Sequence, residues 1–136
     1  MAKKKSKKFA IESDQPEASL KIDAEAAWHT QDDKAGVSMR YYQKKHECLS
    51  SWTKREVKAF SNWVEKMCAR SEPHITSTTK TCHAHKGETK PLPDEISPDV
   101  TVYSLDVTDK ARVHGFFAGG QFFLVWLDRE HKILSG

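Results

Sequence analysis

The chain has 136 residues, which suffices for one domain with a single core and leaves no room for two. Only 38% of the residues are hydrophobic, so part of the chain is expected to stay outside that core. No apolar stretch approaches the ~20 residues that span a bilayer, and no apolar signal core follows the basic N-terminus. The three cysteines form no compact framework, which indicates reduced thiols. These features predict a cytoplasmic protein without a membrane partner.

Residues 1–36 are predicted to form a basic, disordered tail ahead of a single domain at residues 37–136. Five lysines occur within the first eight residues, and few apolar residues follow. A short helix after Pro16 has no sustained apolar stripe. The lysine run either attracts nucleic acid through its phosphates or only keeps the chain in solution, and both interpretations stay open.

The domain is expected to begin with an edge or second-row strand at residues 37–42, followed by the basic residues Lys44, Lys45 and His46. The spacing of Thr53 and Glu56 is that of a capping box, which predicts the start of a helix. Apolar side chains then recur at steps of three and four residues and predict one buried stripe. The stripe consists of Val57, Phe60, Trp63, Val64, Met67 and Cys68.

Residues 71–98 are polar, contain four prolines and predict a long loop, with at most one helical turn near His74. Cys82 and His85 have the spacing of a zinc-binding pair. A structural zinc site requires four ligands, and the second pair is absent, so neither a metal nor another cofactor is expected.

Three β-type runs follow, at residues 101–107, 111–117 and 121–127, and hairpin-length turns join them. This pattern predicts an antiparallel meander. The third run is apolar on both faces, which favours a place at the centre of a sheet covered on both sides or against a helix. The predicted fold class is therefore α+β, with a short N-terminal strand and a helix packed on a curved antiparallel sheet.

The order of these elements resembles the RelE/ParE-like superfamily of small prokaryotic or phage toxins over residues 37–134. The segment Arg112-Val113-His114-Gly115 is similar to the arginine-bearing middle strand of that family. Residues 122–126 are similar to its hydrophobic core strand, and His131-Lys132 to its basic or histidine-bearing C-terminus.

This resemblance implies a toxin that cleaves messenger RNA, commonly on the ribosome, and that a protein antitoxin neutralises. Arg112 would hold the scissile phosphate, because its planar donor fork suits phosphoryl oxygens. His131 would transfer a proton, Asp128 would orient it, and Lys132 would add positive charge. The predicted RNA-binding residues are Lys44, Lys45 and Arg129.

A second interpretation is a non-catalytic protein-interaction module that keeps a toxin-like fold. Arg112 would then only pair with Asp106 or Glu130, and His131 would be an ordinary surface residue. The acidic residues near the meander also favour this interpretation. Its expected exposed contact residues are Tyr103, Phe116 and Trp126.

Overall fold

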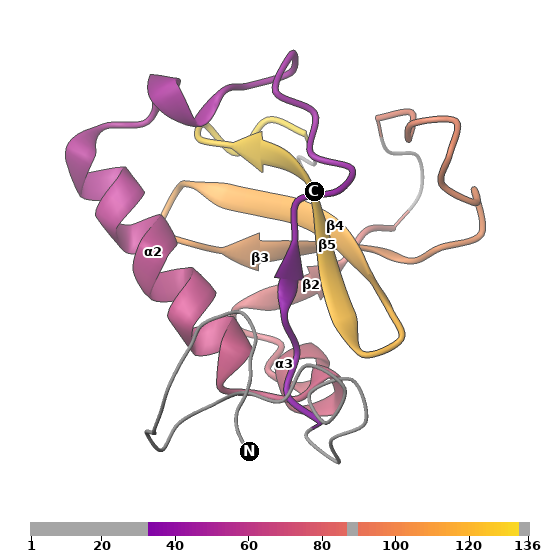
Figure 1. Ribbon diagram of the computed structural model, residues 1–136. Helices are drawn as coiled ribbons and strands as arrows, with labels where there is room; N and C mark the ends of the chain where they lie inside the picture. The colour runs from indigo at the N-terminus through magenta and orange to yellow at the C-terminus, as the bar shows by residue number, and fades with distance from the viewer. Residues whose placement is uncertain (1–32, 87–89, 134–136) are drawn as a thin grey trace, which may run out of the picture. The chain divides into compact units, whose positions relative to one another are not determined.

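The computed structural model describes residues 33–86 and 90–133 (Figure 1). The predicted tail up to residue 32, including its lysine run and the helix after Pro16, lies outside these residues. The described part contains a five-stranded sheet with the order β1-β5-β4-β3-β2 and two α-helices. The strands are β1 (Val37–Ser38), β2 (Cys82–Ala84), β3 (Val102–Asp106), β4 (Arg112–Ala118) and β5 (Gln121–Asp128). The helices are α2 (Lys54–Cys68) and α3 (Glu72–Ser77), with a short 3-10 turn, η1 (Leu49–Ser51), ahead of α2.

The predicted meander is confirmed, because β3, β4 and β5 pair in antiparallel order and end close to the expected residues. The central position belongs to β4, however, and not to the third run, which forms β5. The apolar pattern of β5 has a different cause. Both faces of this strand are covered, since Phe122 and Leu124 belong to one core cluster and Val125 and Trp126 to the other.

The predicted strand at residues 37–42 is wrong in length and the sheet is not purely antiparallel. Only Val37 and Ser38 are extended, and they pair in parallel with Phe122 and Phe123 of β5. The chain then turns, because the amide of Arg40 donates to the Ser38 hydroxyl. The result is a mixed α+β sheet whose edge strand is very short.

Helix α2 begins with the predicted capping box, in which Thr53 accepts from the Glu56 amide and the Glu56 carboxylate accepts from the Thr53 amide. Its apolar stripe packs on the sheet, except for the predicted member Cys68, which is exposed at the end of the helix. The Trp63 ring lies edge-on to Phe122 with ring centroids 5.8 Å apart. Figure 1 shows α2 lying alongside the sheet, and the contact of Trp63 with Phe122 ties the two layers together.

The predicted loop at residues 71–98 contains two regular elements that the sequence analysis did not predict in full. Helix α3 extends beyond a single turn, because Ser71 caps it and Pro73 occupies its first turn, where no backbone donor is needed. Strand β2 pairs with β3, and its Cys82 is buried in the core. Three residues with a single buried apolar side chain give too little periodicity to reveal a strand.

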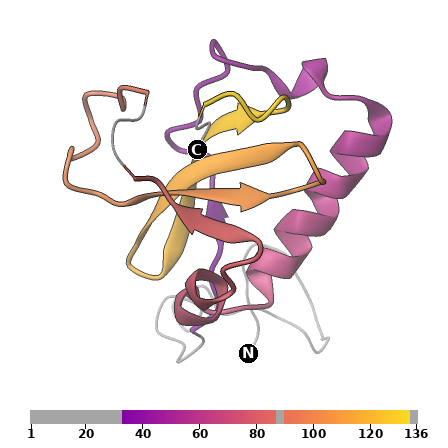
Figure 2. The ribbon, with the colours of Figure 1, turned by 180° about the vertical axis from the view of Figure 1, so that it is seen from behind.

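The second face of the sheet is covered by loops. Figures 1 and 2 show the segment at residues 90–101 on the side of the sheet away from α2. Its apolar residues pack with Phe116 and Trp126, which are 5% and 1% exposed. The prediction that these two residues form an exposed contact surface is therefore wrong, and Tyr103 is half-buried against Phe117.

The packed region begins before Val37, the residue at which the domain was predicted to start. Ala35 is buried, and its amide donates to the Arg70 carbonyl, while the Gly36 carbonyl accepts from the Phe122 amide. Neither helix within residues 33–86 and 90–133 has the length and apolar character needed to cross a bilayer.

Candidate functional site

A histidine and a carboxylate are buried side by side on the loop-covered face of the sheet. His114 lies in β4 and Asp128 ends β5, and both are almost inaccessible, at 0% and 2% exposure. The Nε2 atom of His114 is 2.8 Å from Oδ2 of Asp128. Alternation along β4 directs His114 to the same face as Phe116, opposite the α2 side of the sheet. A buried pair of this kind is stable only when its polar atoms are satisfied.

Asp128 is held by three donors. Besides His114, the amide of Lys132 donates to Oδ1 at 2.7 Å and the amide of Ile133 donates to Oδ2 at 2.9 Å. Burial raises the pKa of the Asp128 carboxyl, but these hydrogen bonds outweigh burial and lower the pKa to about 2. At neutral pH Asp128 is thus an ionised acceptor, so Nε2 of His114 must carry a proton.

A second histidine extends the pair. His85 directly follows β2, and its amide donates to the Val102 carbonyl. Its Nε2 atom is 2.9 Å from Nδ1 of His114, and the two rings meet edge to face at 82°. Burial, followed by the charge of His114, lowers the pKa of His85 to about 4, against a smaller opposing effect of Asp128. Asp128, His114 and His85 therefore form one hydrogen-bonded chain, named here the Asp-His-His chain.

A pocket of about 330 Å³ opens on the same face. Two loops and β5 form it. The first loop is fixed because the Gln43 amide donates to the carbonyl of Val125, the extra residue in the β5 bulge. Three of the lining side chains are basic, namely Lys45, His46 and Lys90. The remaining lining residues are Gln43, Pro91, Leu92, Pro93 and Trp126.

His46 connects this pocket electrostatically with the Asp-His-His chain. Partial burial and then the charge of Lys90 lower the pKa of His46 from its ordinary value. Glu47 and Asp128 oppose this effect, and His114 adds to it. His46 is therefore largely neutral at neutral pH, which is the state of a proton acceptor.

Arg112, the predicted phosphate-binding residue, is engaged by its own chain. Its Nε atom forms an ion pair with Asp106 at 2.9 Å, and Nη1 donates to the Thr108 carbonyl at 2.7 Å and to the Ala111 carbonyl. The side chain is only 12% exposed. These contacts hold the turn between β3 and β4, and the role of Arg112 in binding phosphate stays a prediction.

Asp128 contacts the predicted proton-transfer residue His131 only through the backbone. The His131 amide donates to the Asp128 carbonyl at 3.3 Å, and His131 adopts a positive φ of 56° in the turn after β5. The side chains of His131 and Lys132 are exposed. The carboxylate that was predicted to orient His131 instead binds His114 and the amides of the following turn.

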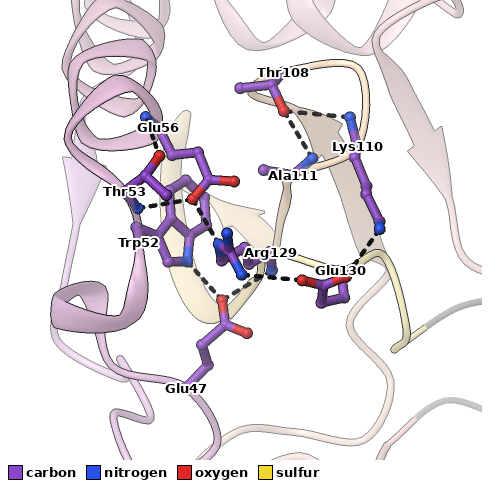
Figure 3. A network of polar contacts seen from close by, with 9 residues as sticks. All are labelled: Glu47, Trp52, Thr53, Glu56, Thr108, Lys110, Ala111, Arg129 and Glu130. Atoms are coloured by element: carbon purple, nitrogen blue, oxygen red, sulfur yellow. Dashed lines mark hydrogen bonds and ion pairs between the residues drawn. The ribbon is translucent and has the colours of Figure 1, made fainter.

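Arg129, a predicted RNA-binding residue, lies in a polar network at the start of α2 (Figure 3). Its Nε atom is 2.6 Å from Glu56, and its Nη1 atom is 3.0 Å from Glu130. The carboxylate of Glu47 accepts from both the Arg129 amide and the Trp52 indole. Figure 3 shows the guanidinium lying among these acidic side chains. Its contacts join the end of β5 to α2.

Cys82 and His85, the possible zinc-binding pair, lie on opposite faces of the sheet. Cys82 belongs to the core cluster on the α2 side, where burial and then the charge of Asp106 raise the pKa of its thiol to about 11. His85 binds His114 on the opposite face. Within the described residues, no three His, Cys, Asp or Glu side chains are arranged to hold a metal ion.

Sequence reasoning assigned no role to His46, Lys90 or His114, and it considered His85 only for metal binding. One signal was present for His114. This residue lies between Val113 and Gly115 in a strand whose other side chains are mostly apolar, and a titratable group at such a position requires a partner. The loop positions of His46 and Lys90 carry no comparable signal, because the contact between the two loops is tertiary.

Comparison of this chain with family models, curated proteins and solved structures found no match. The functional proposal therefore rests on the residues described above and on the resemblance noted from the sequence.

Proposed function

We propose that this protein is an endoribonuclease that binds the RNA backbone in the basic pocket and acts as a toxin controlled by a protein antitoxin. One observation carries the proposal. Three basic side chains from two separate loops line one open pocket, and the buried Asp-His-His chain lies on the same face of the sheet. The RelE/ParE resemblance supplies the toxin assignment, the ribosome as the expected place of cleavage, and the cytoplasm as the expected location.

RNA carries its own nucleophile, so the pocket must supply only proton transfer and positive charge. His46 takes the proton of the 2′-hydroxyl, and the freed oxygen attacks the adjacent phosphorus. Lys45 and Lys90 offset the negative charge that gathers on the phosphoryl oxygens. The bond from phosphorus to the 5′ oxygen then breaks, leaving a 2′,3′-cyclic phosphate, and the 5′ oxygen takes a proton from water.

The apolar part of the pocket favours a nucleotide over a simple anion. Pro91, Leu92 and Pro93 provide apolar surface for a base or sugar beside the two lysines and His46. Proton transfer and lysine charge account for the chemistry without a cofactor. Lys44 adjoins Lys45 in the first loop but is not part of the pocket lining, so its expected role is long-range attraction of RNA.

Cleavage of messenger RNA, with and without ribosomes, tests the proposal. Both His46→Ala and Lys90→Ala are expected to lower the cleavage rate by about 10²-fold, the scale for losing one positioned acid, base or charge. Lys58→Ala is the matched control, because Lys58 is an exposed cation on α2, on the other side of the sheet. Circular dichroism melts check that each variant folds. Absence of cleavage by the wild-type protein in both settings would reject the proposal.

The residues predicted from the sequence belong in the same assay. If Arg112 or His131 acts on the phosphate, Arg112→Ala or His131→Ala lowers cleavage while the fold is kept. If these variants lose activity while His46→Ala keeps full activity, the cleavage site lies at the end of β5 and not in the basic pocket. Co-expression with the product of a small adjacent gene tests the antitoxin, which is expected to abolish cleavage by the wild-type protein.

A further inference from the structure

A second pocket, of about 190 Å³, lies on the face of the sheet that α2 covers. Residues of α2, of α3, of the loop between α3 and β2, and of β3 line it. Figures 1 and 2 show α3 at the C-terminal end of α2, with β2 next to it. We name this site the α2-α3 pocket. It is separate from the basic pocket, whose residues Leu92 and Trp126 pack in the core cluster of the other face.

Part of the lining of the α2-α3 pocket is apolar and is held in place by the core. It consists of Trp63, Met67, Ile75 and Leu105, whose exposed fractions are only 3% to 6%. A dry cavity of about 150 Å³ lined by such side chains is large enough to bind benzene. The α2-α3 pocket therefore has room for one six-membered ring with a small substituent.

Two cations line the same pocket. Lys66 lies in the last turn of α2, and Arg70 follows the helix. Neither side chain forms an ion pair within the described residues, whereas Arg112 and Arg129 are both paired with carboxylates. A cation at the C-terminus of a helix also offsets the helix dipole, but this role does not require an apolar pocket beside it. Cations next to apolar surface are suited to a ligand that has an anionic group and an apolar body.

The single carboxylate of the lining does not cancel this positive charge. Oδ1 of Asp106 forms an ion pair with Nε of Arg112 at 2.9 Å, so the charge of Asp106 is already compensated. Two hydroxyls add hydrogen-bonding capacity. Thr78 donates to the His74 carbonyl, whereas the Thr81 hydroxyl has no partner among the described residues and is able to donate to an anion. The pocket thus favours an anion over a cation.

Backbone hydrogen bonds fix the wall of the pocket formed by the loop ahead of β2. The Thr78 carbonyl accepts from the Cys82 amide at 3.1 Å, and the Thr81 carbonyl accepts from the Asp106 amide at 2.9 Å. A site that is already formed loses little conformational entropy when a ligand enters it.

We propose that the α2-α3 pocket binds a small organic carboxylate that carries one ring-sized apolar group, such as an arylcarboxylate. Lys66 and Arg70 bind the carboxylate, and the Thr81 hydroxyl donates to it. The ring packs against the apolar lining around Trp63 and Ile75. Binding requires no RNA and occurs on the face of the sheet opposite the basic pocket, so this site is independent of the proposed nuclease.

Methyl NMR spectra of the full chain, titrated with benzoate, test this site. The methyl groups of Ile75 and Leu105 report on the α2-α3 pocket, and those of Leu92 report on the basic pocket. Saturable shifts of the Ile75 and Leu105 signals are expected. Absence of saturable shifts at these two residues overturns the proposal, whether or not the Leu92 signals move.

Two further ligands separate the contributions of charge and ring. Acetate has the carboxylate without the ring, and benzyl alcohol has the ring without the charge. Each is expected to bind about tenfold or more weakly than benzoate, because each keeps only one of the two interactions. Acetate binding as tightly as benzoate would show simple ion association at the surface. Equal binding of benzyl alcohol would show that the cations contribute nothing, and either result rejects the proposal.

Substitution of the cations identifies the residues that bind the carboxylate. Lys66→Gln and Arg70→Gln are each expected to lower the affinity for benzoate by about three- to tenfold at low salt. Lys58→Gln is the matched control, because Lys58 is an exposed cation of α2 that does not line the pocket. Circular dichroism melts check that the variants fold. Wild-type affinity in both pocket variants, or the same loss in Lys58→Gln, would contradict the proposal.

The benzoate and RNA assays fail separately. Absence of benzoate binding rejects this site and leaves wild-type RNA cleavage as support for the nuclease. Absence of RNA cleavage rejects the nuclease and leaves benzoate binding, with its dependence on Lys66 and Arg70, as support for this site.

Discussion

Gly115 in β4 has no side chain because β5 occupies the space that one would need. A Cβ atom built there would lie 2.0 Å from the Phe123 carbonyl oxygen and 2.7 Å from Cζ of Phe122. The backbone oxygen cannot move without breaking the pairing of β4 with β5 next to the bulge. Gly115→Ala is therefore expected to lower the free energy of unfolding by about 3 kcal/mol or more, at the upper end for overpacked cores.

Urea denaturation followed by tryptophan fluorescence measures this loss. Gly119→Ala is the matched comparison, since Gly119 has a positive φ of 59° but no atom within 4 Å of its built Cβ. The cost there is limited to left-handed backbone strain, about 1 kcal/mol. Similar losses for the two variants would contradict the close contact at Gly115.

Two histidines, His85 and His46, make the free energy of unfolding depend on pH. The pKa of folded His85 is about 4 against an ordinary value of 6.5, so below pH 6.5 the unfolded chain binds this proton more readily. The stability contributed by His85 is complete above pH 6.5 and is lost as the pH falls towards about 4. The lowered pKa of His46 adds a loss in the same direction.

His85→Gln is expected to flatten this acid limb, because glutamine does not titrate. From the pKa difference, reduced for solvent screening because His85 is only partly buried, wild type should lose roughly 2 kcal/mol more than the variant between about pH 7 and pH 4. Asp128, whose pKa is lowered to about 2, contributes a separate loss below about pH 4 in both proteins. Urea unfolding curves at successive pH values measure these limbs, and parallel curves for the two proteins would show that His85 titrates normally.

At the scale of elements, the first turn of α2 is bound to the end of β5 through one carboxylate. Glu56 closes the capping box and also accepts from Arg129 at 2.6 Å (Figure 3). Glu56→Ala removes both contacts, so the expected loss of unfolding free energy is about 1–2 kcal/mol. Thermal melts with Glu65→Ala, an exposed change on the same helix, provide the comparison. Equal melting temperatures would mean that the network adds nothing to stability.

Elements with strong local signals were predictable from the sequence, and those fixed by distant contacts were not. The capping box predicted the start of α2, and alternation with hairpin turns predicted β3, β4 and β5. Strand β2 has only three residues and exists because β3 pairs with it. The parallel pairing of β1 with β5 joins segments more than 80 residues apart, and no pattern in either segment specifies it.

In the candidate site too, residues with a local signal were predictable and their distant partners were not. Asp128 was singled out because polarity changes abruptly after an apolar strand, and Lys45 because it belongs to a basic run. The partner assigned to Asp128 was His131, the histidine nearest in sequence, whereas the sheet register brings His114 to it. Neighbouring strands place residues 14 positions apart in contact, so the register must be known before the partner can be identified.

At the scale of the whole molecule, the position of positive charge is expected to matter more for RNA binding than the net charge. The formal net charge is only +3, yet three basic groups line one pocket, while Arg112 and Arg129 are paired with acidic side chains elsewhere in the described chain. Paired cations release few counterions on binding a polyanion, because their charge is already compensated. RNA affinity is thus expected to depend on the pocket lysines and far less on the two arginines.

The salt dependence of RNA binding tests this distribution. Each lysine that contacts a phosphate contributes about 0.7 to the slope of log affinity against log salt for single-stranded RNA. Lys45→Ala and Lys90→Ala should therefore each reduce the slope by about that amount, and Arg129→Ala should leave it nearly unchanged. Binding is measured by fluorescence anisotropy with an RNA whose 2′-hydroxyls are replaced by hydrogen, so that cleavage cannot occur. A reduced slope in Arg129→Ala with unchanged slopes in both lysine variants would place the RNA at the end of β5, outside the pocket.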